Sequence, residues 1–234
     1  MSSYTNQPHP GGYGAPQQNP YAQATLRPLR PLIGLARAGA WTMMAGQLLD
    51  TGWTVAYWQS TMQADLETLT LLDIWAIPVL VLVLVGTVLA LVGGCRWLAQ
   101  ARRNAELLPP FQPQRLSSAW VWWSWIVPIV SWWWPRRVVL DVWADTAPAT
   151  PARRLVNRWW GFWVAGTIVG ILTSRQDVAD PSMAGRAVLF TIITSACLGV
   201  ALHAWLQILD RITRDQDQVI GAPPPAATGW PSAG

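Results

Sequence analysis

One acidic side chain and one histidine, both ionisable, fall inside the long apolar stretches of the sequence, where a charge is costly and often marks a functional site. Asp50 lies in the stretch 36–58, three residues after Gln47 and on nearly the same face of a helix. Such a carboxyl group can hold a cation or relay a proton. It can also be protonated, or hydrogen-bonded to Gln47 or to a hydroxyl group of a neighbouring helix, and we favour this second interpretation.

His203 is the other ionisable side chain, in the stretch 187–209. If four helices cross a membrane, the expected depths of His203 and Asp50 differ by about 12 Å at 1.5 Å per residue. This separation excludes a direct hydrogen bond, so a proton relay between them would need further groups. We therefore predict that His203 is a packing residue.

Patterns typical of catalysis or metal binding are missing from the sequence. It has no Gly-rich phosphate loop, no cluster of metal ligands and no nucleophile elbow. Cys95 and Cys197 are too few for a disulfide framework or a structural zinc site. All 16 basic residues are Arg, and they lie beside the ends of apolar stretches, which favours lipid headgroups over nucleic acid. We expect no enzyme, no cofactor and no metal.

The elements that must position these residues are apolar helices. Hydrophobic residues make up 52% of the chain and charged residues 12%, against roughly a quarter in a soluble domain. A bilayer core of about 30 Å takes about 20 helical residues, and four stretches are predicted to span it: 36–58, 74–98, 155–172 and 187–209. We predict an all-α membrane domain over residues 31–214, between disordered tails at 1–30 and 215–234.

Small residues four apart occur in the last two stretches. The pairs are Gly166 with Gly170 and Ser195 with Gly199. Such spacing lets helix backbones approach closely, either within a bundle or between two copies of a chain. We predict packing within the bundle, with a homo-oligomer as the alternative.

The segment 119–134 is apolar and rich in tryptophan, a residue that prefers the level of the lipid headgroups. Its two tryptophan clusters are about 10 Å apart along a helix, so they cannot mark opposite faces of a membrane. We predict a re-entrant or interfacial segment broken at its proline, with a fifth span as the alternative. Its residues are Trp120, Trp122, Trp123, Trp125, Pro128, Trp132, Trp133 and Trp134.

The distribution of Arg discriminates between these two topologies. With four spans and cytoplasmic tails, 14 Arg residues lie inside and two, Arg175 and Arg186, lie outside. With a fifth span the numbers become nine and seven. Because positive residues favour the cytoplasmic side, we predict four spans with both termini in the cytoplasm.

The residues that follow, 136–147, have the pattern of an amphipathic helix. Val138, Val139, Val142 and Trp143 share its apolar face. The helix lies flat in the inner interface or packs on its neighbours in a cytoplasmic loop, and both interpretations stay open.

The run from Arg96 to Pro148 resembles the core of a bacterial membrane-protein family labelled domain of unknown function 4328. The matching motifs are at Ala101–Ala105, Trp125–Ile129, Pro135–Val138 and Asp141–Trp143. With the runs LVNRWWGFW and ITRDQDQ, the resemblance extends over about residues 30–220. Trp132–Trp134 depart from the family, whose members commonly have Asn-Leu-like residues there. The resemblance implies a bacterial inner membrane but no activity, substrate or cofactor.

Polar residues of these motifs are expected to gather at the cytoplasmic interface, around the tryptophan-rich segment. They are Arg102, Arg103, Asn104, Arg136, Arg137 and Asp141. In a structural cluster, Asp141 or Glu106 would pair with Arg and Asn104 would cap a helix. If the cluster instead binds a lipid headgroup or a small anion, it is the best functional site in the chain.

We predict a non-enzymatic structural or interaction component of the membrane, whose tails are available to partners. Its expected partners are the lipid bilayer, anionic lipid headgroups, and a second copy or another membrane protein. The alternative is a small transporter or channel that uses Asp50 and the cytoplasmic Arg cluster.

Overall fold

The computed structural model describes residues 26–107, 116–144, 149–176 and 180–221, and all of its regular elements are helical. In chain order they are α2 (Arg30–Gln63), α3 (Leu66–Leu107), α4 (Trp120–Ile126), the 3₁₀ helix η1 (Val130–Trp132), α5 (Trp134–Ala144), α6 (Ala149–Thr173) and α7 (Pro181–Gly221). No strand occurs in these ranges. The prediction of an all-helical fold is therefore confirmed.

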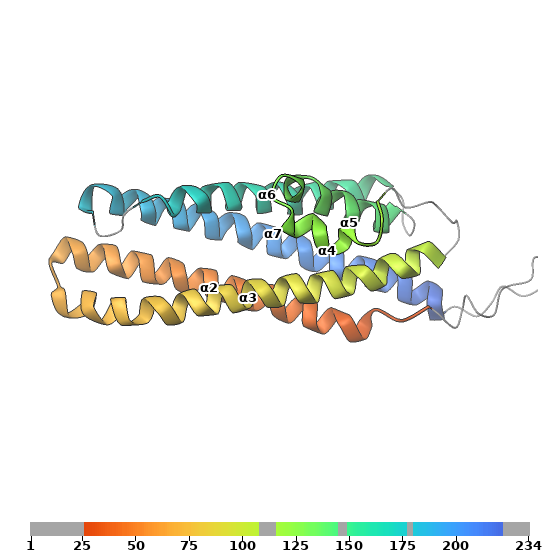
Figure 1. The fold of residues 1–234 in the computed structure, drawn as a ribbon, viewed down its shortest axis with the longest axis horizontal. Helices are drawn as coiled ribbons and strands as arrows, with labels where there is room; N and C mark the ends of the chain where they lie inside the picture. Colours follow the sequence, from red (N-terminus) through yellow and green to blue (C-terminus); the bar gives the residue numbers. More distant parts are fainter. Residues whose placement is uncertain (1–25, 108–115, 145–148, 177–179, 222–234) are drawn as a thin grey trace, which may run out of the picture.

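The four long helices form two antiparallel hairpins, α2–α3 and α6–α7, which pack together through α2 and α7 (Figure 1). The end of α2 and the start of α3, like the end of α6 and the start of α7, lie at one end of the bundle, here called the turn end. The start of α2 and the end of α7 lie at the other end, here called the terminal end. Among the described Arg residues, only Arg175 and Arg186 lie toward the turn end.

Two of the described helices, α3 and α7, are long and apolar enough to cross a membrane. The helices α2 and α6 do not meet the same criterion, so the prediction of four apolar spans is supported for two. The C-terminal tail predicted from residue 215 also needs correction, because α7 continues to Gly221. The rest of the predicted tails lies largely outside the described residues.

Glycines bring α2 and α3 into close contact. Gly39 and Gly46 on α2, like Gly86 and Gly93 on α3, are seven residues apart, close to two helical turns. A Cβ atom on Gly39 would stand 2.5 Å from the backbone of α3, and one on Gly86 2.7 Å from the backbone of α2. Any other residue at these two positions would push the helices apart. The sequence analysis missed this seven-residue spacing.

The predicted small-residue pairs lie in looser contacts inside the same bundle. A Cβ atom on Gly166 would stand 3.2 Å from Leu198 across the α6–α7 hairpin. At Gly170 and Gly199 the nearest atoms of neighbouring helices would be 3.8 and 3.9 Å away. These residues therefore serve packing within the bundle.

The tryptophan-rich segment folds as short helices between α3 and α6, in the half of the bundle toward the terminal end (Figure 1). The helix α4 ends at Ile126 because Pro128 holds the preceding Val127 in an extended conformation, with ψ of 115°. With seven residues, α4 rises about 10 Å and is too short to cross a bilayer. The predicted break at Pro128 is thus present, and α4 by itself is too short to be a fifth span.

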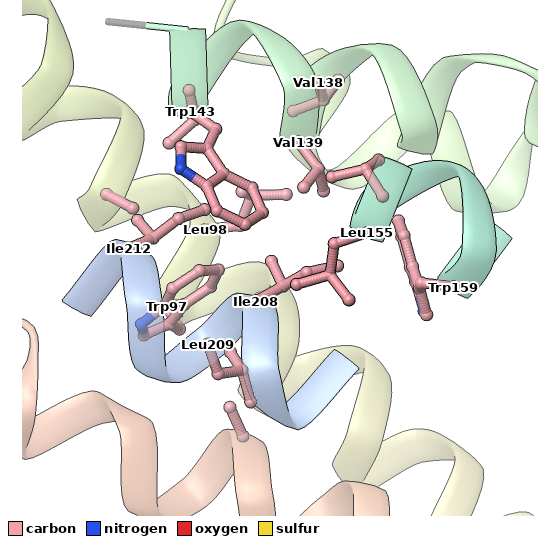
Figure 2. Packing of buried hydrophobic residues seen from close by; sticks show 14 of the residues in the cluster. Trp97, Leu98, Val138, Val139, Trp143, Leu155, Trp159, Ile208, Leu209 and Ile212 are labelled. Atoms are coloured by element: carbon pink, nitrogen blue, oxygen red, sulfur yellow. The ribbon is translucent and has the colours of Figure 1, made fainter. Parts of the chain in front are cut away.

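The main hydrophobic core lies where α4 and α5 meet α3, α6 and α7 (Figure 2). On α5, the predicted apolar face of Val138, Val139, Val142 and Trp143 is at most 2% exposed. It packs toward α3 and α7, where Trp97 is fully buried. The amphipathic helix is therefore packed on its neighbours, because a helix lying on the membrane surface would present this face to lipid.

Candidate functional site

A half-enclosed cavity of about 260 Å³ lies between the two hairpins, next to the tryptophan-rich segment. All four long helices line it, together with α4 and Ser131 of η1. On α3 the lining includes Leu91, Cys95 and Leu98, and on α7 it includes Ala201. None of the lining residues carries a charge.

Tryptophan rings form one wall of this cavity. The ring centroid of Trp125 on α4 lies within 6.2 Å of those of Trp159, Trp160 and Trp163 on α6. Trp159 in turn stacks on Trp205 of α7, with centroids 4.9 Å apart and planes inclined by 28°. Each aromatic pair stabilises the fold by about 0.5–1.5 kcal/mol beyond its buried area. The wall therefore ties three helices together while it borders the cavity.

The tryptophans predicted to mark an interface divide into two groups. Trp122, Trp123 and Trp133 are exposed. Trp125 instead packs inward against α6, and Trp120 packs on Trp134 with ring centroids 3.9 Å apart. The backbone oxygen of Trp132 accepts a hydrogen bond of 3.2 Å from Trp160. The inward-facing rings thus pack against protein, and the location of the group at a membrane interface stays a prediction. Their partners on α6 and α7 were not singled out from the sequence, although Trp159, Trp160 and Trp163 share one side of a helix.

The hydroxyl and thiol groups that line the cavity are engaged with backbone oxygens. Thr87 Oγ1 donates to Val83 at 2.8 Å, one turn earlier in α3. Ser131 Oγ donates to Pro128 at 2.7 Å, and Cys95 Sγ donates to Val121 at 3.4 Å. A ligand of this cavity is therefore held mainly by apolar contacts.

Asp50 lines a second, smaller cavity of about 160 Å³ between α2 and α3. The other lining residues are apolar or aromatic and include Trp53 and Leu80. Within the described residues, the Asp50 carboxyl group forms no hydrogen bond or ion pair, and the expected bond to Gln47 is not formed. Gln47 is half-buried. Asp50 is thus placed in one hairpin and away from the larger cavity.

His203 is exposed, which contradicts the prediction of a packing residue. Its Nε2 atom lies 2.9 Å from Gln207 Nε2 in a hydrogen bond along α7. Thr51, next to Asp50, bonds to Ser195 on α7, so Asp50 lies near the level of Ser195. His203 is eight residues further along, about 12 Å, and the two ionisable groups are therefore separate.

The predicted polar cluster separates into buried and exposed residues. Arg102 is 3% exposed, bonds to Glu106 at 2.9 Å, and also donates to the backbone oxygens of Leu116 and Ser117. It thereby fastens the start of the tryptophan-rich segment to α3. Arg136 donates to Asn157 Oδ1 at 2.8 Å.

The remaining members of the cluster are Arg103, Arg137, Asn104 and Asp141. Both Arg side chains are exposed, and Asp141 is half-buried. Asn104 is fully buried and bonds elsewhere in the fold, so it does not cap a helix. Arg103 and Arg137 are therefore the members of the cluster that are available to an anion on the surface at the terminal end.

A buried amide network joins α3, α7 and the chain before α2. Asn104 Nδ2 donates to the backbone oxygen of Arg27 at 2.8 Å and to Gln216 Oε1 at 3.1 Å. Its Oδ1 accepts from Gln100 at 3.0 Å, and Gln216 Nε2 donates to the backbone of Ala101 at 2.9 Å. The sequence analysis missed Gln216 because it assigned this residue to a disordered tail.

Hydroxyl groups form a second contact between helices. Thr51 Oγ1 on α2 lies 2.6 Å from Ser195 Oγ and 3.4 Å from Thr191 Oγ1, both on α7. Interhelical hydrogen bonds of this kind join helices in a medium without water. In the part of the chain that is described, no group of three or more His, Cys, Asp or Glu residues is placed to hold a metal ion.

Residues 59–214 match the model of the family described as domain of unknown function DUF4328. The chain belongs to this family. The match begins near the end of α2, so it is narrower than the resemblance over about residues 30–220. It includes α3 through most of α7, and hence most of the residues around the larger cavity. No curated protein and no solved structure matches the chain.

Proposed function

We propose that this DUF4328 protein is a multi-pass membrane protein whose four long helices all cross the bilayer. The observation that carries this proposal is the outward-facing apolar surface of α3. Only 11% of the residues in its most apolar 18-residue window are buried, whereas a core helix of a soluble protein is mostly buried. Ile77 is 70% exposed and Ile74 64%. Lipid is the surrounding that makes such a surface stable.

The hairpin arrangement extends this argument to α2 and α6. Each packs antiparallel along a helix that is apolar enough to span, and each also exposes large apolar residues, such as Trp41 and Ile168. A bilayer that surrounds α3 and α7 would therefore also surround their partners. Polar residues of α2 bond to neighbouring helices, as Thr51 does to Ser195, or to their own helix, as Thr42 does to Ala38. Asp50 lies in the smaller cavity between α2 and α3.

The orientation follows from the charges at the two ends. Arg175 and Arg186 lie toward the turn end, which also carries Asp65, Glu67 and Asp180. The other described Arg residues lie toward the terminal end. Since positive residues favour the cytoplasmic side, the terminal end and both termini would face the cytoplasm of a bacterial cell.

Single cysteines test this topology in a variant without Cys95 and Cys197. The exposed sites are Gln63 and Ser182 at the turn end and Ser118 and Gln218 at the terminal end. A membrane-impermeant maleimide should label Gln63→Cys and Ser182→Cys in intact cells, and the other two only after permeabilisation. Labelling of Ser118→Cys and Ser182→Cys from the same side would replace this topology by one with a fifth span. Extraction of the chain by alkaline carbonate would overturn membrane integration.

Within the membrane, we propose a structural or interaction role rather than catalysis. This role is supported by how the motif residues are used, because Arg102 and Asn104 hold parts of the fold together. The exposed Arg103 and Arg137 are available to anionic lipid headgroups or to an acidic partner beside the tails. Removal of both charges should leave the folded protein intact and lower its retention of anionic lipid. Unchanged lipid retention in Arg103→Gln/Arg137→Gln would leave no lipid role for these two residues.

Transport is a second candidate, supported by the unpaired carboxyl group of Asp50 in an apolar cavity. Proton or cation flux would be measured in liposomes that contain the full-length protein. Transport through this site predicts that flux is lost in Asp50→Asn and kept in Gln47→Leu. An unchanged flux in Asp50→Asn would exclude it.

A further inference from the structure

The larger cavity is not accounted for by the packing of the chain itself. It is half-enclosed, has a volume of about 260 Å³, and lies between residues of all four long helices. It is lined by uncharged residues, and its hydroxyl and thiol groups are bonded to backbone oxygens. These properties select an apolar occupant.

The shape of the cavity suits a linear hydrocarbon. Along α3 its lining extends from Thr87 to Leu98, eleven residues that rise about 16 Å. This length is about half of a bilayer core, in the half toward the terminal end. Trp125, Trp159 and Trp205 border the cavity with flat apolar rings. Such a space is long enough for much of one lipid chain.

The cavity opens on a surface that would touch lipid. Thr87 both lines the cavity and is exposed, so it lies at the opening. Its neighbours Leu84 and Val88 are 55% and 56% exposed and belong to the outward-facing surface of α3. In a membrane, lipid is the molecule that meets this opening.

The charges near this half of the bundle select the lipid headgroup. Arg103, Arg153 and Arg154 are exposed at the terminal end and form no ion pair with a described acidic residue. Between Arg158 and Thr173, α6 carries no acidic residue, and α3 carries none between Asp73 and Glu106. Glu106, the acidic residue nearest to Arg103 along α3, pairs with Arg102. Exposed Arg side chains that form no ion pair attract an anionic headgroup.

We propose that the cavity binds one acyl chain of an anionic phospholipid from the leaflet at the terminal end. This inference rests on the proposed location of the protein in a membrane. It identifies a specific lipid partner of the fold, in addition to the general contact of its surface with lipid. The lipid chain completes the space between α3 and α6 next to the tryptophan-rich segment.

The test uses native mass spectrometry of the full-length protein in detergent, with phosphatidylglycerol or phosphatidylcholine added. Thr87→Phe fills the opening and Ala90→Phe fills the interior of the cavity. Thr70→Phe is the matched control, because Thr70 is exposed on the same helix and bonds to its own backbone in the same way as Thr87. If the new ring displaces two methylene groups of the lipid chain from the cavity, the affinity for the lipid falls about tenfold. Both cavity variants should therefore lose the single phosphatidylglycerol adduct.

Retention of that adduct in Thr70→Phe and its loss in both cavity variants would support the inference. Equal retention of the adduct in the wild type and all three variants would overturn the inference. Equal loss of the adduct in Thr70→Phe and the cavity variants would also overturn it, because the lipid would then bind only to the surface. A dimer that disappears in Thr87→Phe, without any lipid adduct, would assign the cavity to a second copy of the chain. If Ala90→Phe does not fold, Thr87→Phe decides, since its side chain is exposed.

The headgroup is tested separately with Arg103→Gln/Arg153→Gln/Arg154→Gln. Phosphatidylglycerol should bind the wild type better than phosphatidylcholine does, and the triple variant should bind both equally. Equal binding of both lipids to the wild type would overturn the inferred preference for an anionic headgroup. The topology of Thr87→Phe is checked separately, by combining this substitution with the single cysteines and labelling them in cells. If the topology is as proposed but the wild type binds no lipid, only the lipid site is contradicted.

Discussion

At the scale of single residues, glycines let α2 and α3 approach each other closely. Gly39 meets the backbone of Leu89 and Ala90, and Gly86 meets that of Thr42 and Met43. Backbone atoms cannot rotate out of the way as a side chain can. These positions therefore tolerate substitution less than their helical location alone would indicate.

Gly39→Ala should destabilise the protein by about 1–3 kcal/mol, because its Cβ atom would stand 2.5 Å from backbone atoms of α3. The measurement is the thermal unfolding of the detergent-solubilised protein. Gly52→Ala is the control, since Gly52 is on the same helix and has nothing within 4 Å of the added Cβ atom. It should leave stability unchanged or raise it by up to about 1 kcal/mol through better helix propensity. Equal effects of the two variants would contradict the proposed close contact.

At the scale of elements, α5 acts as a packed helix that closes the core beside α3 and α7. Val139→Ala should lower the free energy of unfolding by about 2 kcal/mol, because its side chain is fully buried. Arg137→Ala, on the exposed side of the same helix, should change it by less than about 0.5 kcal/mol. The measurement is denaturant unfolding followed by tryptophan fluorescence. A neutral Val139→Ala would indicate that this face contacts lipid instead of protein.

The starts of α3 and α7 are stabilised by carboxylates at the turn end. Thr68 donates its side-chain and backbone hydrogen bonds to Asp65 and lowers the pKa of that carboxyl group. Hydrogen bonds from Ser182 lower the pKa of Asp180 in the same way. Because the folded state favours the ionised form, this stabilisation is complete above the ordinary aspartate pKa of about 3.9 and is lost as pH falls through the lowered pKa.

Acidification from pH 6 to pH 3 should therefore lower the unfolding temperature of the wild type, and less so that of Asp65→Asn/Asp180→Asn. The two asparagines keep a cap but do not titrate. Glu67→Gln, in the first turn of α3, is the control and should keep the response of the wild type. A double variant with the full response would place the acid sensitivity elsewhere in the chain.

At the scale of the whole molecule, two hairpins are joined by the contact of α2 with α7. The hydroxyl bond between Thr51 and Ser195, 2.6 Å long, lies in this contact. In a double-mutant cycle of Thr51→Val and Ser195→Ala, we expect a coupling energy of about 0.6 kcal/mol and at most about 1.7 kcal/mol. Thr42→Val replaces Thr51→Val in the control cycle, because Thr42 bonds only to its own helix, and should show no coupling. Absence of coupling in both cycles would show that the hairpins are held by apolar contacts alone.

Much of the helical architecture could be predicted because its signals are local in sequence. Each of the four long helices contains a predicted apolar stretch, and Pro128 breaks the tryptophan-rich segment through its effect on the residue before it. Predictions for individual polar residues were less successful. His203 was assigned to the interior and is exposed, while Gln216 was assigned to a tail and is fully buried.

The sequence by itself determined the helical class, the family and the unequal distribution of Arg, because composition and motifs do not depend on how helices pack. Only the tertiary structure decided which residues meet. Asn104 and Gln216 are 112 positions apart, and the lining of the larger cavity comes from six helical elements. The helices α3 and α6 face each other across that cavity because glycines hold α3 against α2 and tryptophans hold α6 against α7. No local pattern encodes such an arrangement, since it depends on the distances between whole helices.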